Sequence, residues 1–318
     1  MSTNRARLAA RAAAIAMVLF ALPASGALLN YEYGAAQGQL GLIRILAERM
    51  SKQNLLYQLH LADNEKLEMF KTTQKMDEAI TSLRKGDPLA GIPTPPTPEI
   101  RARIGELEAA WAPLRDSALA SPYEYLRRSR EFLIPENRRA DPLLMLHFDQ
   151  VAAGVIAAAN AVGKLYDEQC RADEYTHCDL VLRQGRAEML TERMVKLAIL
   201  VFTGIGPETT PKELAEARDA YEAMGLTDSA KRLAEQVTAA ERGGNGAYMS
   251  RLLREITESW GRLRRRVDLV IDGTAEAEDI RQAVRIQELI VADLQLFTVA
   301  VTQFARIEQG GQGIPDQP

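Results

Sequence analysis

Residues 41–52 read GLIRILAERMSK, and residues 185–196 read GRAEMLTERMVK. Placed on each other at an offset of 144 positions, the two segments coincide at Gly41/Gly185, Leu46/Leu190, Glu48/Glu192, Arg49/Arg193, Met50/Met194 and Lys52/Lys196. The two tryptophans, Trp111 and Trp260, lie 149 positions apart, and each is followed by Leu three residues later and Arg four residues later. Because such a period is too long for a solenoid repeat, we predict two tandem domains of one fold.

The composition favours helices throughout both domains. Hydrophobic residues make up 47% of the chain and aromatic residues only 6%, which is typical of helices packed through aliphatic side chains. No stretch shows the alternating pattern of a strand. We therefore predict an all-α protein of two tandem four-helix bundles, with a first module over residues 28–172 and a second over 173–318. The Gly- and Pro-rich tail from Gln309 is predicted to be disordered.

The helices expected in the first module follow from apolar spacing and from turn residues. They cover Tyr33 to beyond His60, Asn64 to Leu83, a helix containing Trp111 that Thr97 caps, a short extra helix at Tyr123–Phe132, and Pro142–Asp167.

The second module repeats this plan. Its expected helices cover Leu182–Thr203, a helix that begins at a Thr210–Glu213 capping box and resumes over Ser229–Glu241, the Trp260 helix, and Ala275–Glu308.

The N-terminus has the three parts of a secretory signal peptide. Three arginines (Arg5, Arg7, Arg11) precede the apolar run Ala12–Leu22, and small residues follow up to Ala27. The apolar run is shorter than the roughly 20 residues that a membrane-spanning helix needs, although an uncleaved anchor is the alternative. We expect residues 1–27 to be cleaved and the mature protein to be exported to the periplasm.

The charge balance disfavours a nucleic-acid partner. Without the three arginines of the signal peptide, 36 basic residues remain against 43 acidic ones, and phosphate contacts dominate the affinity of nucleic-acid-binding proteins.

Two cysteines, Cys170 and Cys178, lie close together at the boundary between the modules. In an oxidising compartment we expect them to form a disulfide. Three scattered histidines and the absence of metal-ligand spacing argue against a metal site.

The two motif copies resemble the AGRQRMLSQRMAK-type helix of the PilJ/NarX-like sensor domain, the periplasmic N-terminal part of type IV pilus methyl-accepting chemotaxis transducers and of nitrate/nitrite sensor kinases. The resemblance implies a helical bundle, usually dimeric, that senses a small ligand. It also implies that the arginine of the family's Arg-Met pair contacts the anion. That position is Arg44 in the first module, followed by Ile45, but it is Glu188 in the second.

Four arginines are the candidate ligand contacts: Arg44, Arg49, Arg186 and Arg193. A guanidinium group suits a planar oxyanion because it presents a planar fork of donors and stays charged. Arg186 would point about 200° around the helix from the position that matches Arg44. The alternative is that Arg44 and Lys52 form surface ion pairs with Glu48. Arg49 and Arg193 would then link their helices to neighbouring helices.

No phosphate loop, nucleophile elbow or zinc-protease motif is present, so we expect neither an enzyme nor a cofactor. We expect an exported sensory protein that binds a small oxyanion, similar to nitrate or nitrite, or a metabolite. It would relay binding to a membrane-bound receptor, because we find neither a membrane-spanning helix nor an output domain. The two modules would pack as an internal pseudo-dimer or the chain would dimerise. The alternative is a periplasmic scaffold protein without a small-molecule ligand.

Overall fold

The computed structural model describes residues 30–59, 65–132, 142–172, 178–225 and 245–308. Its helices are α2 (Asn30–Gln58), α3 (Glu65–Lys85), α4 (Pro98–Phe132), α5 (Pro142–Ala172), α6 (Cys178–Thr203), α7 (Thr210–Ala223), α9 (Asn245–Ile271) and α10 (Ala277–Glu308). The described residues contain no strand, only an isolated bridge between Asp87 and Ile92. The prediction of an all-α fold is confirmed.

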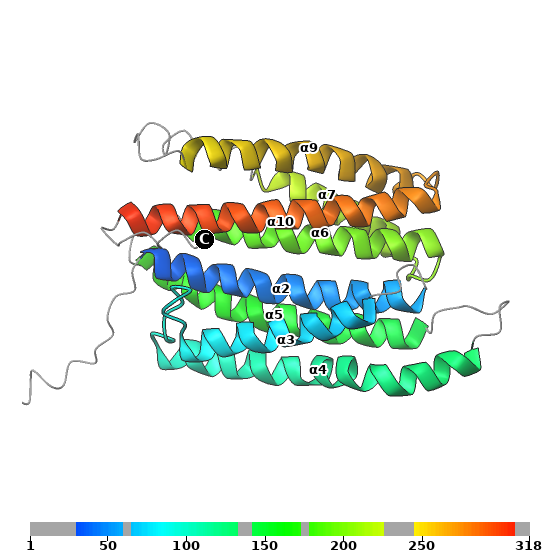
Figure 1. Ribbon diagram of the computed structural model, residues 1–318, viewed down its shortest axis with the longest axis horizontal. Helices are drawn as coiled ribbons and strands as arrows, with labels where there is room; N and C mark the ends of the chain where they lie inside the picture. The colour runs from blue at the N-terminus through cyan, green and yellow to red at the C-terminus, as the bar shows by residue number, and fades with distance from the viewer. Residues whose placement is uncertain (1–29, 60–64, 133–141, 173–177, 226–244, 309–318) are drawn as a thin grey trace, which may run out of the picture.

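The described helices pack side by side and divide between two hydrophobic cores (Figure 1). The first core consists of residues from α2, α3, α4 and α5. The second consists of residues from α6, α7, α9 and α10, with Leu56 of α2 added. In Figure 1, α2 and α6 lie next to each other in the middle of the molecule, between α4 at one edge and α9 at the other.

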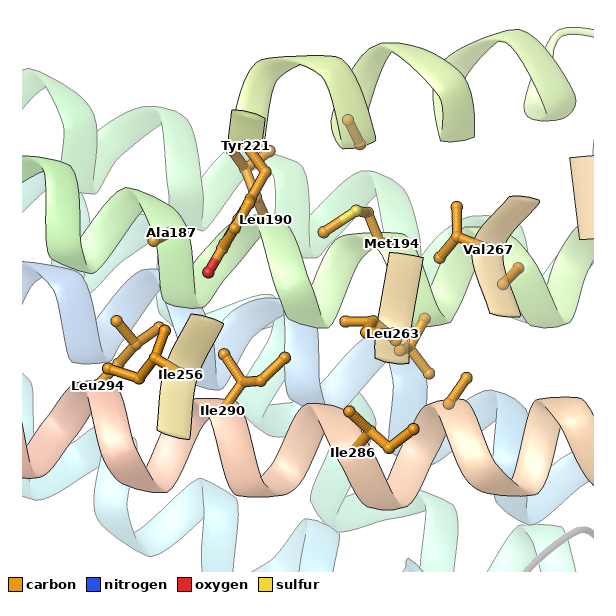
Figure 2. Packing of buried hydrophobic residues seen from close by; sticks show 14 of the residues in the cluster. Ala187, Leu190, Met194, Tyr221, Ile256, Leu263, Val267, Ile286, Ile290 and Leu294 are labelled. Atoms are coloured by element: carbon orange, nitrogen blue, oxygen red, sulfur yellow. The ribbon is translucent and has the colours of Figure 1, made fainter. Parts of the chain in front are cut away.

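Each core contains one tryptophan, as expected for residues that fill the interior. Trp111 is buried in the first core, and its Nε1 donates a hydrogen bond to Asp77 Oδ1 at 2.6 Å. In the second core, Trp260 is partly buried and stacks on Tyr221 with ring centroids 4.1 Å apart. Figure 2 shows side chains of the second core that come from α6, α7, α9 and α10, among them Met194, Leu263 and Ile290.

The beginnings of two helices test the predicted caps. Thr97 Oγ1 accepts a hydrogen bond from Ile100 N at 3.2 Å, which confirms the cap of α4. The second helix of the second module begins at Thr210 as predicted, but the predicted capping box is wrong. Thr209 is the N-cap of α7 and makes no side-chain cap, and its hydroxyl donates to Glu213 Oε1 at 2.9 Å. The separate helix expected at Tyr123–Phe132 is also wrong, since α4 continues to Phe132.

Several predictions concern parts of the chain outside the described residues. These are the signal peptide at residues 1–27, the helix at Ser229–Glu241 and the tail from Gln309. Among the helices that are described, none is both long and apolar enough to cross a membrane.

The two motif copies meet where α2 and α6 cross. A Cβ atom added to Gly41 would lie 3.0 Å from Gly185 Cα, and a Cβ added to Gly185 would lie 2.9 Å from Gly41 Cα. The two backbones therefore touch at the equivalent glycine of each repeat, and only glycine allows this approach.

Candidate functional site

Beyond the glycine contact, the repeats exchange two buried ion pairs. Lys52 Nζ of α2 lies 2.8 Å from Glu192 Oε2 of α6, and Lys196 Nζ of α6 lies 2.7 Å from Glu48 Oε2 of α2. None of the four side chains is more than 5% exposed. Because Glu48 corresponds to Glu192 and Lys52 to Lys196, the pairs are related by the same internal symmetry as the glycines.

This arrangement corrects the surface-pair interpretation of the motif. Glu48 does not pair with Arg44 or Lys52 of its own helix at the surface, but is buried against Lys196 of the other repeat. The physical reason is that a charge removed from water requires a close, desolvated partner, whereas exposed pairs within one helix contribute little.

The last helix of each bundle adds one polar group to the buried layer. Lys196 also contacts Asp149 of α5, and Lys52 Nζ donates a hydrogen bond to Gln287 Oε1 of α10 at 2.6 Å. Burial alone would lower the pKa of Lys196, but Glu48 and Asp149 raise it above its ordinary value. The layer therefore remains charged at neutral pH and holds the two bundles together.

Arg49 and Arg193 occupy one repeat position and each links two helices. Arg49 Nε donates to Glu192 Oε1 at 2.8 Å and joins α2 to α6. Arg193 Nη2 lies 3.5 Å from Glu213 Oε2 of α7, on the outside of the second bundle, with 42% of its side chain exposed. Each arginine therefore links two helices, Arg49 between the two bundles and Arg193 at the surface.

Arg44 is buried without a counter-ion. It is 5% exposed, its Nε has no hydrogen-bond partner, and no ion pair links it to a described residue. Burial lowers its pKa to about 10, so the guanidinium remains protonated at neutral pH. Gly163 of α5 faces its end, because a Cβ added there would lie 3.1 Å from Arg44 Nη2.

Glu188 occupies the position of Arg44 in the second repeat, and it is 4% exposed. Burial raises its pKa to about 8, against the opposing effects of a hydrogen bond from Gln295 and the charge of Arg49. One repeat position therefore places a buried cation in the first bundle and a largely neutral acid in the second.

The four candidate arginines are not brought together. Arg44 lies inside the first bundle, Arg49 lies between the two bundles, and Arg193 lies at the surface. Arg186 is exposed. Arg44 is therefore enclosed, Arg49 is partly exposed and lines a pocket, and Arg186 and Arg193 lie on the outside.

That pocket, of about 440 Å³, lies between α2, α3 and α10 and was not anticipated from the sequence. It is lined by Arg49, Lys52, Gln53, Glu65, Glu68, Glu288, Val291, Ala292 and Gln295. The motif contains Arg49 and Lys52, but it could not identify the pocket, since the residues of α10 lie more than 200 positions from those of α2 and α3.

Cys170 is buried at the end of α5 and is disulfide-bonded. The side chain of Cys178, its expected partner, lies outside the described residues. Within the part of the chain that the structure describes, no three His, Cys, Asp or Glu side chains are grouped as metal ligands would be.

Comparisons with known proteins add no assignment to this geometry. No family model, no curated protein and no solved structure matches the chain. The resemblance to PilJ/NarX-like sensor domains stays a prediction from the two motif copies.

Proposed function

We propose that this protein is an exported sensory protein that binds a small anion through Arg44. The observation that carries the proposal is a buried guanidinium without an acidic partner among the described residues. Such a group costs free energy unless an anion compensates it, and its planar fork of donors suits an oxyanion similar to nitrate or nitrite.

The surroundings of Arg44 support an anion contact next to α5. Gly163 has no side chain, so the end of the guanidinium lies close to the backbone of α5 and not against a side chain at this position. Gln37 lies close by, because its Nε2 donates a hydrogen bond to Gly163 O at 2.8 Å. An anion bound here would neutralise a charge between α2 and α5, and the resulting change in helix packing would be read by a membrane-bound receptor.

Isothermal titration calorimetry of the purified protein tests this function. Nitrate, nitrite, other small oxyanions and a metabolite panel are titrated into the wild-type protein, Arg44→Met and Gly163→Ala. We expect one oxyanion to bind the wild type and Arg44→Met to lose this binding. Gly163→Ala should weaken the binding, because its methyl group would lie beside Arg44 Nη2. Arg193→Met, at the surface, is the matched control and should bind normally. Equal binding by Arg44→Met, or no binding by the wild type, would contradict the proposal.

A second candidate function is partner docking without a small ligand, and one surface feature favours it. Leu289, Leu296 and Val299 lie along α10 and are 53%, 46% and 53% exposed. Exposed apolar residues at helical spacing are typical of surfaces that bind another protein. Replacing these three residues by glutamine should abolish binding to a receptor under this alternative and leave anion binding unchanged.

A further inference from the structure

In the pocket between α2, α3 and α10, the cations that line it, Arg49 and Lys52, come from α2. Each oxygen of the buried Glu192 carboxylate lies beside a cation, with Oε1 at 2.8 Å from Arg49 Nε and Oε2 at 2.8 Å from Lys52 Nζ. One carboxylate therefore compensates two cations. The hydrogen bond of Arg49 to Glu192 uses Nε, and within the described residues its two terminal amino groups donate none. Arg49 lines the pocket with 23% of its side chain exposed, so this fork can reach a ligand.

The carboxylates that line the pocket come from the other two helices. Glu65 and Glu68 of α3 and Glu288 of α10 line it. Neither Glu65 nor Glu288 forms a hydrogen bond or an ion pair with another described residue, whereas Glu68 pairs with Lys71 at 2.7 Å. Burial raises the pKa of Glu65, and the negative charges of Glu288 and Glu68 add to this effect, while Lys52 opposes it. Glu65 and Glu288 therefore have no ion-pair partner among the described residues.

The charges of the pocket and its direct partners do not balance. Four carboxylates (Glu65, Glu68, Glu192, Glu288) stand against three cations (Arg49, Lys52, Lys71). A ligand with one net positive charge would restore neutrality. Because α2 supplies the cations and α3 and α10 supply the carboxylates, a ligand that contacts all three helices would carry an anionic group for Arg49 and cationic groups for the glutamates. Val291 and Ala292 of α10 provide an apolar wall that an alkyl chain could contact.

We propose that this pocket binds an amino acid with a cationic side chain, with its carboxylate on Arg49 and its ammonium groups on Glu65 and Glu288. An α-carboxylate pairs well with a guanidinium fork, and each charge-assisted hydrogen bond in a partly enclosed site is strong. This site is separate from Arg44 and does not depend on the anion proposed there. Because α3 belongs to the first bundle and α10 to the second, a ligand held there would connect the two bundles.

Three probes of similar length separate the contributions of the charged groups. L-lysine carries the carboxylate and both ammonium groups, L-norleucine lacks the side-chain ammonium, and 1,5-diaminopentane lacks the carboxylate. Calorimetric titration of the purified protein should show lysine binding, with each of the other probes at least about tenfold weaker. If lysine does not bind at millimolar concentration, or if norleucine or the diamine binds as well as lysine, the assignment is overturned.

Variants of the lining residues locate the site. Glu65→Gln and Glu288→Gln should each weaken lysine binding about tenfold or more. Arg49→Gln should remove the preference for lysine over the diamine. Because Arg49 also contacts Glu192, Ala292→Trp serves as a second variant: it starts from an exposed helix position and should block the pocket without disturbing the buried layer. Unchanged lysine affinity in Glu65→Gln, Glu288→Gln and Ala292→Trp would overturn the proposal.

Arg44→Met separates this proposal from the anion-binding function. It should bind lysine as the wild type does, because Arg44 does not line the pocket. Loss of oxyanion binding with retained lysine binding supports two independent sites. Loss of lysine binding in Arg44→Met would overturn the pocket as a separate site.

Discussion

The helices α2 and α6 carry the same motif, and their polar residues are equivalent where the two helices meet. There, the glycine, the glutamate and the lysine are identical, and each pairs with the other repeat. Toward the interior of each bundle, Leu46/Leu190 and Met50/Met194 are still identical core residues. The equivalence ends at one position, because Arg44 faces Gly163 of α5 while Glu188 bonds to Gln295 of α10.

This difference indicates what each part of the motif does. The contact between the two copies of the motif is made twice, once in each direction. Both copies therefore need the same residues, because each residue of one copy contacts the partner residue in the other copy. A residue that faces its own bundle is free of that requirement and can acquire a separate role. Arg49 and Arg193 also occupy equivalent positions in different surroundings, since only Arg49 lines the pocket between the bundles.

The largest expected effect comes from breaking one of the reciprocal pairs. Lys196→Met leaves Glu48 buried without its cation, which should lower the free energy of unfolding by about 3–5 kcal/mol. Urea denaturation measures this change. Lys212→Met, which removes a lysine that is 80% exposed, is the control and should change stability by less than about 1 kcal/mol.

A double variant sharpens this test. Adding Glu48→Met to Lys196→Met removes the unpaired buried charge and should restore part of the lost stability, since apolar groups can replace a buried pair. Additive losses in the two single variants would show that the side chains do not interact.

The second expected effect is a pH dependence that comes from Glu188, at the position where the first repeat has Arg44. Glu188 has a pKa of about 8 in the folded protein against an ordinary value of 4.5. The unfolded chain therefore releases this proton first, and stability should fall by about 1.4 kcal/mol per pH unit as pH rises between these two values.

Glu188→Gln should remove this contribution and be more stable than the wild type at pH 7. Denaturant unfolding at several pH values measures it, with Glu216→Gln, 64% exposed, as the control. The titratable groups around Glu188 are Arg49, Glu192 and Tyr221. If stability falls with pH equally in wild type and Glu188→Gln, the pH dependence belongs to one of these groups.

A smaller effect is expected at the glycine crossing. Gly41→Ala places a methyl group 3.0 Å from the backbone of Gly185, which should push α2 and α6 apart and cost about 1–3 kcal/mol. Gly105→Ala, on an exposed face of α4 with no atom within 4 Å, should instead stabilise the protein by about 0.5–1 kcal/mol. Equal thermal stabilities of the two variants would contradict the close approach of α2 and α6.

The sequence was sufficient for the helices and for the equivalence of the two motif copies, because apolar spacing and turn residues are local signals. It was not sufficient for the pairing of Glu48 with Lys196, since a motif defines the spacing of charges but not the helix that faces them. The isolation of Arg44 and the pocket also depend on which residues α5, α3 and α10 place opposite α2. These are properties of the tertiary packing.

The central claim is that Arg44 binds an anion. Its most direct test is the thermal unfolding of wild type and Arg44→Met with and without nitrate. Without anion, Arg44→Met should be the more stable protein, because it replaces an uncompensated buried charge with an apolar side chain. With nitrate at about 100 times its dissociation constant, the wild type should gain about 2.7 kcal/mol and the variant nothing. An Arg44→Met protein that is less stable without anion, together with a wild type that does not respond to nitrate, would contradict the claim.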